Sequence, residues 1–320
     1  MTPLAVSLGA TGLALLAIAF PLPVYALTLG AFGLVHVLAE LRYVDLRFAG
    51  RLPGRLVAEW SLLLGGVVLI RMLAMAGAVA GPPRALAELA VVGLLALSVV
   101  RLARHAGPRG AVVGGLAGLV VLLLLVGSAA APFETLVVLA FLHNLTPIGF
   151  LAERTSGDAR RRVLSACAVL FGLVPLLIAT GGPRRALAAL GWDGAALAVP
   201  GVGGVADHLG AFVPSWIGGA AAVDLFTAAV YLQCLHYAVV IGVLPRLLPA
   251  GARRGLVLWP GRSRFVAMLA VVGAVGLFAF ARSFAGTREL YGVFAAVHAW
   301  VEVPVLLAAP ALAAAAPRPA

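Results

Sequence analysis

Long apolar runs, cut at intervals by arginine-rich breaks, constrain this chain more than any other feature of its sequence. A helix needs about 20 apolar residues to cross a hydrocarbon core about 30 Å thick. The run 111–125 holds only Ala, Val, Gly and Leu, and it does not alternate in polarity as a strand of a transmembrane barrel does. The runs therefore predict an all-α, polytopic integral membrane helix bundle.

Composition excludes the main soluble classes. The chain is 63% hydrophobic and 11% charged, whereas a soluble domain is about 45–50% apolar and about 25% charged. So few charges cannot coat a water-soluble enzyme, and so high a hydrophobicity excludes disorder. The formal net charge is +11, but neither a basic domain nor a recognition motif accompanies it, so we expect no nucleic-acid partner.

Charge clusters and Gly/Pro breaks divide the chain into ten candidate spans. We treat 1–320 as a single membrane domain with spans at 3–20, 22–43, 56–80, 85–103, 110–131, 133–152, 162–180, 218–246, 264–283 and 288–312. With the N-terminus inside, 17 arginines fall in the inner loops and tail and 5 in the outer ones. The positive-inside rule then places both termini in the cytoplasm.

One long outer segment, 181–217, is too apolar for a free linker. It contains Trp192, Trp216 and a glycine-rich stretch, so we interpret it as an extracytoplasmic cap or re-entrant segment anchored by its tryptophans. We expect His208 in this cap, His105 in an inner loop and Asp224 near a span end to be reached by water.

Four of the six histidines lie within predicted spans, where polar residues are costly and face the protein interior. They are His36, His143, His236 and His298, in the second, sixth, eighth and tenth spans. At about 1.5 Å per residue, the last three share a level near the middle of the membrane. We interpret the four as ligands of one buried metal centre, of one or two ions, with separate packing histidines as the alternative.

Two of these histidines are followed by a glutamate one helical turn later. The segments are His36-Val-Leu-Ala-Glu40 and His298-Ala-Trp-Val-Glu302. Residues i and i+4 share a helix face, so each glutamate can ligate the ion, orient an imidazole or accept a proton. Imidazole and carboxylate ligands suit non-haem iron, with copper or haem as alternatives.

Further polar residues accompany these segments. Tyr237 and Gln233 flank His236 and are candidates for positioning oxygen or a water. Together with Glu40 and Glu302 they are the candidate catalytic residues. Pro147 follows His143 closely and predicts a kink. Arg71, within the third span, needs a buried partner, for which Glu88 is the candidate. Two cysteines, both in apolar runs, predict buried structural thiols.

The four histidine segments resemble those of the bacterial membrane carotene dioxygenases, which cleave β-carotene to retinal. That family is polytopic and holds a non-haem iron with one histidine motif on each of several helices. The pairs His36/Glu40 and His298/Glu302 match its histidine-then-acid motifs, although Val35 replaces its proline and both acids are Glu rather than Asp. The resemblance implies iron ligation by the four histidines, an apolar isoprenoid substrate and a bacterial inner-membrane location.

Three functions follow from these residues. The first is a metal-dependent oxidoreductase, of the oxygenase or desaturase kind, that acts on a lipid or isoprenoid entering from the membrane. The second is a proton-coupled secondary transporter that uses the buried His/Glu pairs. The third is a haem-binding electron-transfer protein with axial histidines.

Overall fold

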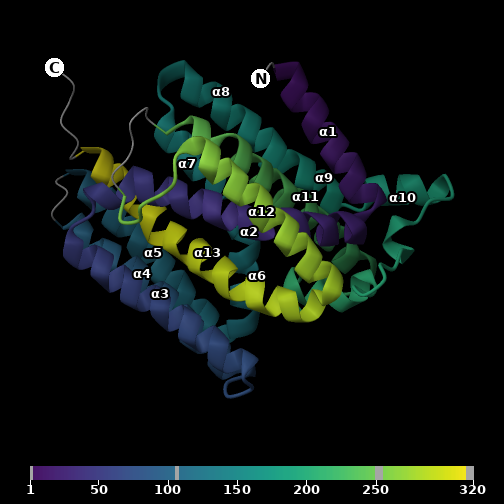
Figure 1. The fold of residues 1–320 in the computed structure, drawn as a ribbon, viewed down its shortest axis with the longest axis horizontal. Helices are drawn as coiled ribbons and strands as arrows, with labels where there is room; N and C mark the ends of the chain where they lie inside the picture. Colours follow the sequence, from purple (N-terminus) through teal and green to yellow (C-terminus); the bar gives the residue numbers. More distant parts are fainter. Residues whose placement is uncertain (1–2, 105–107, 249–254, 315–320) are drawn as a thin grey trace. The chain divides into compact units, whose positions relative to one another are not determined.

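A computed structural model describes residues 3–104, 108–248 and 255–314 (Figure 1). Within these ranges the chain is helical, and its sole β pairing is an isolated bridge between Val199 and Gly203. The α-helices are α1 (Pro3–Ala19), α2 (Pro21–Phe48), α3 (Gly54–Met75), α4 (Gly81–Ala103), α5 (Pro108–Ala130), α6 (Pro132–His143), α7 (Thr146–Arg154), α8 (Gly157–Cys167), α9 (Val174–Ala179), α10 (Gly182–Ala189), α11 (Gly219–Gly242), α12 (Arg262–Arg282) and α13 (Phe284–Ala314).

The predicted fold class is confirmed. Among the described residues, nine helical segments are long and apolar enough to cross a membrane, with α6–α7 and α8–α9 each forming one of them. The first expected span is α1, whose 17 residues include the shorter apolar helix Ser7–Ala19. The predicted boundary near Pro21 is correct, since α1 ends at Ala19 and α2 begins at Pro21. His105, Arg253, Arg254 and Arg318 lie outside the described residues.

The chain forms two compact units, each built from segments far apart in sequence. The first contains residues 1–36, 137–244 and 269–288. Its central helix is α11, which packs against α1, α7 and α9. Of the apolar window of α11, 72% is buried, more than in any other candidate span of the described chain. Small residues such as Ala228 and Ala229 let neighbouring backbones approach this helix closely.

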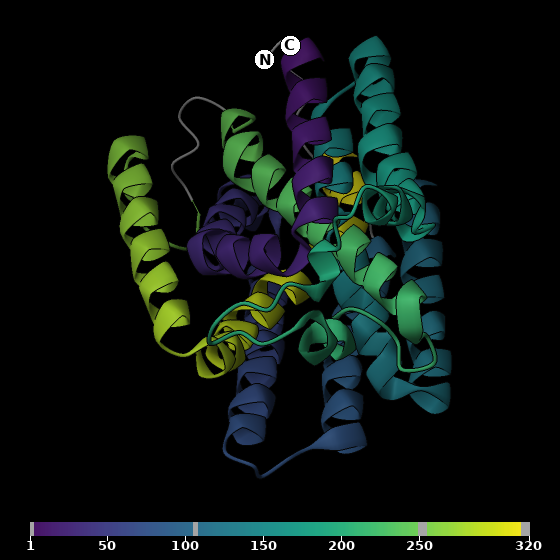
Figure 2. The same cartoon turned by 90° about the vertical axis from the view of Figure 1, so that its right-hand side faces the viewer.

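The second unit contains residues 37–136, 245–268 and 289–320. In it α3, α4 and α5 follow one another and pack side by side, as Figures 1 and 2 show. The Trp60 indole N–H donates to the Ser98 hydroxyl over 2.7 Å, which joins α3 to α4 inside the unit. Leucines on the outer side of α5, among them Leu122 and Leu125, are more than half exposed. A surface of this kind suits contact with lipid tails rather than water.

The predicted cap 181–217 contains α10, short 3-10 turns and the Val199–Gly203 bridge. Trp192 fixes it to the end of α1, because its indole N–H donates to the Ala19 carbonyl over 2.9 Å. Its ring also meets Phe20 edge-on at 5.2 Å. These contacts are with protein, so anchoring of the cap at the membrane interface by its tryptophans stays a prediction. Whether the cap lies outside the cytoplasm stays a prediction.

Candidate metal centre

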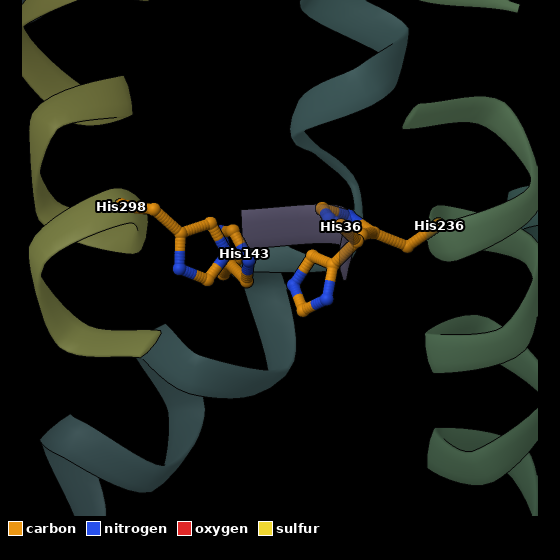
Figure 3. Close-up of side chains that lie close together, drawn as sticks. All are labelled: His36, His143, His236 and His298. Atoms are coloured by element: carbon orange, nitrogen blue, oxygen red, sulfur yellow. The ribbon is translucent and has the colours of Figure 1, made fainter. Parts of the chain in front are cut away.

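Three of the four predicted histidines lie in the first unit, and the structure brings them together. His36 lies on α2, His143 ends α6, and His236 lies on α11. Each offers a ring nitrogen, and these atoms lie within 4.8 Å of one another (Figure 3). The His143 and His236 ring centroids are 4.7 Å apart, and those of His36 and His236 are 5.4 Å apart. Nitrogens bound to one ion at about 2.0–2.2 Å would be separated by no more than about 4.5 Å, so the group is close to that geometry.

The ring of His36 is oriented by the helix that carries it. Its Nδ1 lies 3.2 Å from the Phe32 carbonyl, one turn earlier on α2. An Nδ1–H donating to this carbonyl leaves the lone pair on Nε2 for a metal. Metal-ligating histidines commonly have such a partner on the second nitrogen, which fixes tautomer and ring direction. Sequence reasoning missed Phe32, because its contribution is a backbone atom.

A break in the sixth predicted span positions His143. Helix α6 ends at His143 and α7 starts at Thr146, with Pro147 in its first turn. The Thr146 hydroxyl donates to the His143 carbonyl over 2.7 Å, and the Asn144 amide donates to the Ala140 carbonyl over 3.2 Å. These side chains satisfy carbonyls that the broken helix leaves without amide donors. The predicted kink at Pro147 is therefore confirmed, and it sets the position of a candidate ligand.

The two residues expected to flank His236 are both buried on α11. The Tyr237 ring stacks on His36 with centroids 3.9 Å apart and planes 25° apart. Gln233 is 5% exposed and shares the helix face of His236 and Tyr237 by its spacing. Tyr237 thus supports a candidate ligand directly. Nothing in the geometry assigns a chemical step to either residue, and their catalytic roles stay predictions.

The second unit holds the other candidate ligands. Glu40 lies on α2, and His298 and Glu302 lie one turn apart on α13. All three are at most 1% exposed, and their ligand atoms lie within 4.8 Å of one another. Two carboxylates and an imidazole so deeply buried within candidate membrane spans are costly unless a cation, a proton or a hydrogen-bond donor accompanies them.

The described chain therefore offers two groups of side chains that could hold a metal ion. The first group is His36, His143 and His236 in the first unit, and the second is Glu40, His298 and Glu302 in the second unit. Carboxylate and imidazole are donors that iron, manganese and zinc all accept. The prediction of buried histidines and glutamates able to bind a metal is confirmed at this level. The identity of the metal and the roles of the individual residues stay predictions.

The expected partner of Arg71 is confirmed, and the structure adds a third member. Arg71 donates to Glu88 Oε1 from Nη2 at 2.5 Å and from Nε at 3.2 Å. The indole of Trp300, on α13 between His298 and Glu302, donates to the same oxygen over 2.7 Å. Arg71 also reaches the Gly292 carbonyl on α13. This cluster fixes α13 to α3 and α4, and Trp300 escaped the sequence analysis because a tryptophan in an apolar run carries no polar signal.

Asp224 is not reached by water, contrary to expectation. It is 4% exposed and pairs with Arg184 of α10, whose Nε lies 2.6 Å from Oδ1 and Nη2 3.3 Å from Oδ2. This two-point contact covers the carboxylate, and the same hydrogen bonding raises the pKa of Arg184 above its ordinary value. Both predicted structural thiols, Cys167 and Cys234, are buried and free.

His208 is also buried rather than solvated, with 3% of its surface exposed. Its Nε2 lies 3.1 Å from the Val202 carbonyl, and Arg288 donates to its Nδ1 over 2.8 Å. The ring lies among aromatic side chains, with centroids 5.5 Å from Tyr25 and 5.4 Å from Phe284. Burial lowers the pKa of His208. The expectation failed because one sequence position shows nothing of the aromatic rings that close over it.

The fold and these groups define a class: a polytopic helical membrane protein with buried histidine and glutamate side chains that could hold a metal ion. No protein-family model, curated protein or solved structure matches the chain. Any narrower assignment rests on the chemistry of its own residues.

Proposed function

We propose that this protein is a membrane-embedded oxidoreductase that depends on non-haem iron and acts on an apolar lipid or isoprenoid. The observation that carries the proposal is the group of three histidines from α2, α6 and α11, held within 4.8 Å of one another inside candidate membrane spans. Three imidazoles leave room for carboxylate or open positions, an arrangement that suits iron. His298 is the fourth candidate ligand.

The chain's own residues supply binding, orientation and exclusion of water. His36 is fixed by the Phe32 carbonyl and by the stacked ring of Tyr237. His36 and His236 are at most 1% exposed, so the candidate ligands lie away from bulk water. Bound iron would supply the redox chemistry that protein side chains lack. The apolar outer faces of the helices give a lipid-soluble substrate a lateral approach from the membrane.

Resemblance to the carotene-cleaving dioxygenases supports a substrate class of carotenoids. It rests on the four histidine segments and on the glutamates at positions 40 and 302. Purified protein in detergent, supplied with β-carotene and oxygen, is expected to release retinal. If the protein acts instead on a lipid or isoprenoid other than β-carotene, the proposed metal-dependent chemistry still stands. The resemblance to the dioxygenases would then extend only to the metal ligands.

Metal analysis of the purified protein tests the proposal most directly. We expect iron in the wild-type protein after iron-supplemented expression, and a lower iron content in H36A, H143A and H236A. These variants should still insert, because alanine is easier to place in a bilayer than histidine. H208Q is the matched control, since it changes a buried histidine of the same unit outside the ligand group, and it should keep its iron.

Other outcomes point to the other two functions. Haem absorbance in place of non-haem iron indicates electron transfer. Protein without iron, copper, manganese or zinc overturns the oxidoreductase, and pH-dependent flux lost in E40Q or E302Q would then identify a proton-coupled transporter. Equal, modest losses of stability without any change in metal content would show that the histidines serve packing.

A further inference from the structure

Glu40, His298 and Glu302 form a ligand set of their own in the second unit. The two residues on α13 are separated by one turn, about 6 Å along the helix axis, and therefore share a face. Glu40 comes from α2, so two helices supply the three side chains. Glu40 and Glu302 are 0% exposed and His298 is 1% exposed. Of the chain's 12 acidic residues, Glu40 and Glu302 are the two that follow a histidine by one helical turn within a predicted span.

Two carboxylates at this separation cannot both stay ionised in a buried site without compensation. Their ligand oxygens lie within 4.8 Å of each other and of a ring nitrogen of His298. A shared proton is one solution, as in carboxylate pairs that titrate together. A divalent cation is another, and it neutralises both charges at once. His298 favours the cation, because its imidazole nitrogen completes a three-ligand set with the two carboxylates.

The donor atoms of this set differ from those of the first unit. His36, His143 and His236 offer nitrogen alone, whereas the set in the second unit offers two carboxylates and one nitrogen. Carboxylate oxygens are hard donors that favour Mn²⁺ and Fe²⁺ over softer ions.

We propose that Glu40, His298 and Glu302 bind a second divalent ion, Fe²⁺ or Mn²⁺, in addition to the ion at His36, His143 and His236. This goes beyond the proposed function, which needs one metal ion and leaves the glutamates as supporting residues. It gives both carboxylates a direct role as ligands. The protein then carries two metal ions per chain.

Metal stoichiometry of purified full-length protein tests this proposal. After expression with added iron or manganese, elemental analysis against protein concentration should give two ions per wild-type chain. E302Q and E40Q should each retain one ion, and H236A should also retain one. Combining H236A with E302Q should leave none. E88Q is the matched control, because it changes a buried glutamate of the same unit outside the ligand set, and it should retain two.

A measurement on the wild-type protein keeps the test independent of how the variants fold. Chelator-treated protein is titrated with Mn²⁺ and followed by electron paramagnetic resonance, where two binding steps are expected. Infrared spectra should lose a protonated-carboxyl band as the second ion binds. A single step, with one ion in both wild type and E302Q, overturns the second ion while the proposed function stands. No metal at all in the wild type overturns both.

Discussion

At the scale of residues, Tyr237 has two possible roles, one for its ring, which stacks on His36, and one for its hydroxyl. The ring supports a candidate ligand at a centroid distance of 3.9 Å, and the hydroxyl is a candidate for positioning oxygen or water. We expect Y237F to keep the wild-type iron content, because it retains the ring, and to lower product formation by about 10²-fold or more, a usual cost of removing a positioned hydrogen-bond donor. Y237A should lower iron content as well.

Elemental analysis and product assays on the same preparations check this prediction. Y231F is the control, because Tyr231 is a fully buried tyrosine on the same helix, and it should behave as wild type. Loss of iron in Y237F would instead mean that the hydroxyl helps to hold the metal. Unchanged iron in Y237A would mean that the stacked ring does not support His36.

At the scale of elements, the cap meets α2 and α13 through His208. Neutral His208 accepts a hydrogen bond from Arg288 at Nδ1. Protonation of His208 would place its positive charge beside that of Arg288, with Asp207 as the nearby acid. Since burial lowers the folded pKa of His208, the unfolded chain binds this proton more readily. The contribution of neutral His208 to the free energy of unfolding is therefore complete above about pH 6.5. It is lost as the pH falls below that value, by at most about 1.4 kcal/mol per pH unit.

Thermal unfolding in detergent between pH 7.5 and 5.5 measures this effect. The wild type should unfold at a lower temperature as the pH falls, and H208Q, which does not titrate, should show a weaker pH dependence. An unfolding temperature that is equally pH-sensitive in both proteins would place the titrating group elsewhere.

The elements themselves were largely predictable. The fourth predicted span ends at residue 103, as α4 does, and the break at His143 follows from Pro147. Apolar length and proline are local signals, because they act within one helix. The burial of Asp224 by Arg184 was not predictable, since the arginine comes from an element 40 residues away in sequence.

At the scale of the whole molecule, the arginine distribution predicts that both termini are cytoplasmic. Nine crossings would leave the termini on opposite sides, so this topology requires α1 to cross as well. Its 17 residues rise about 25 Å, slightly less than the hydrocarbon core. Reporter fusions at both ends should give cytoplasmic signals. An N-terminal reporter active outside the cytoplasm, with the C-terminal reporter inside, would mean that α1 lies at the membrane surface instead.

The sequence alone determined the all-α membrane class, the approximate positions of the spans, the placement of the four histidines within spans and the Arg71–Glu88 pair. Each depends on hydropathy, on charge or on spacing within one or two neighbouring helices, which are properties that short segments carry. The tertiary structure decided which ligands meet: three histidines in one unit, and Glu40, His298 and Glu302 in the other. It also decided the burial of His208. Ring direction and ligand separation depend on contacts between distant helices, and no single segment contains that information.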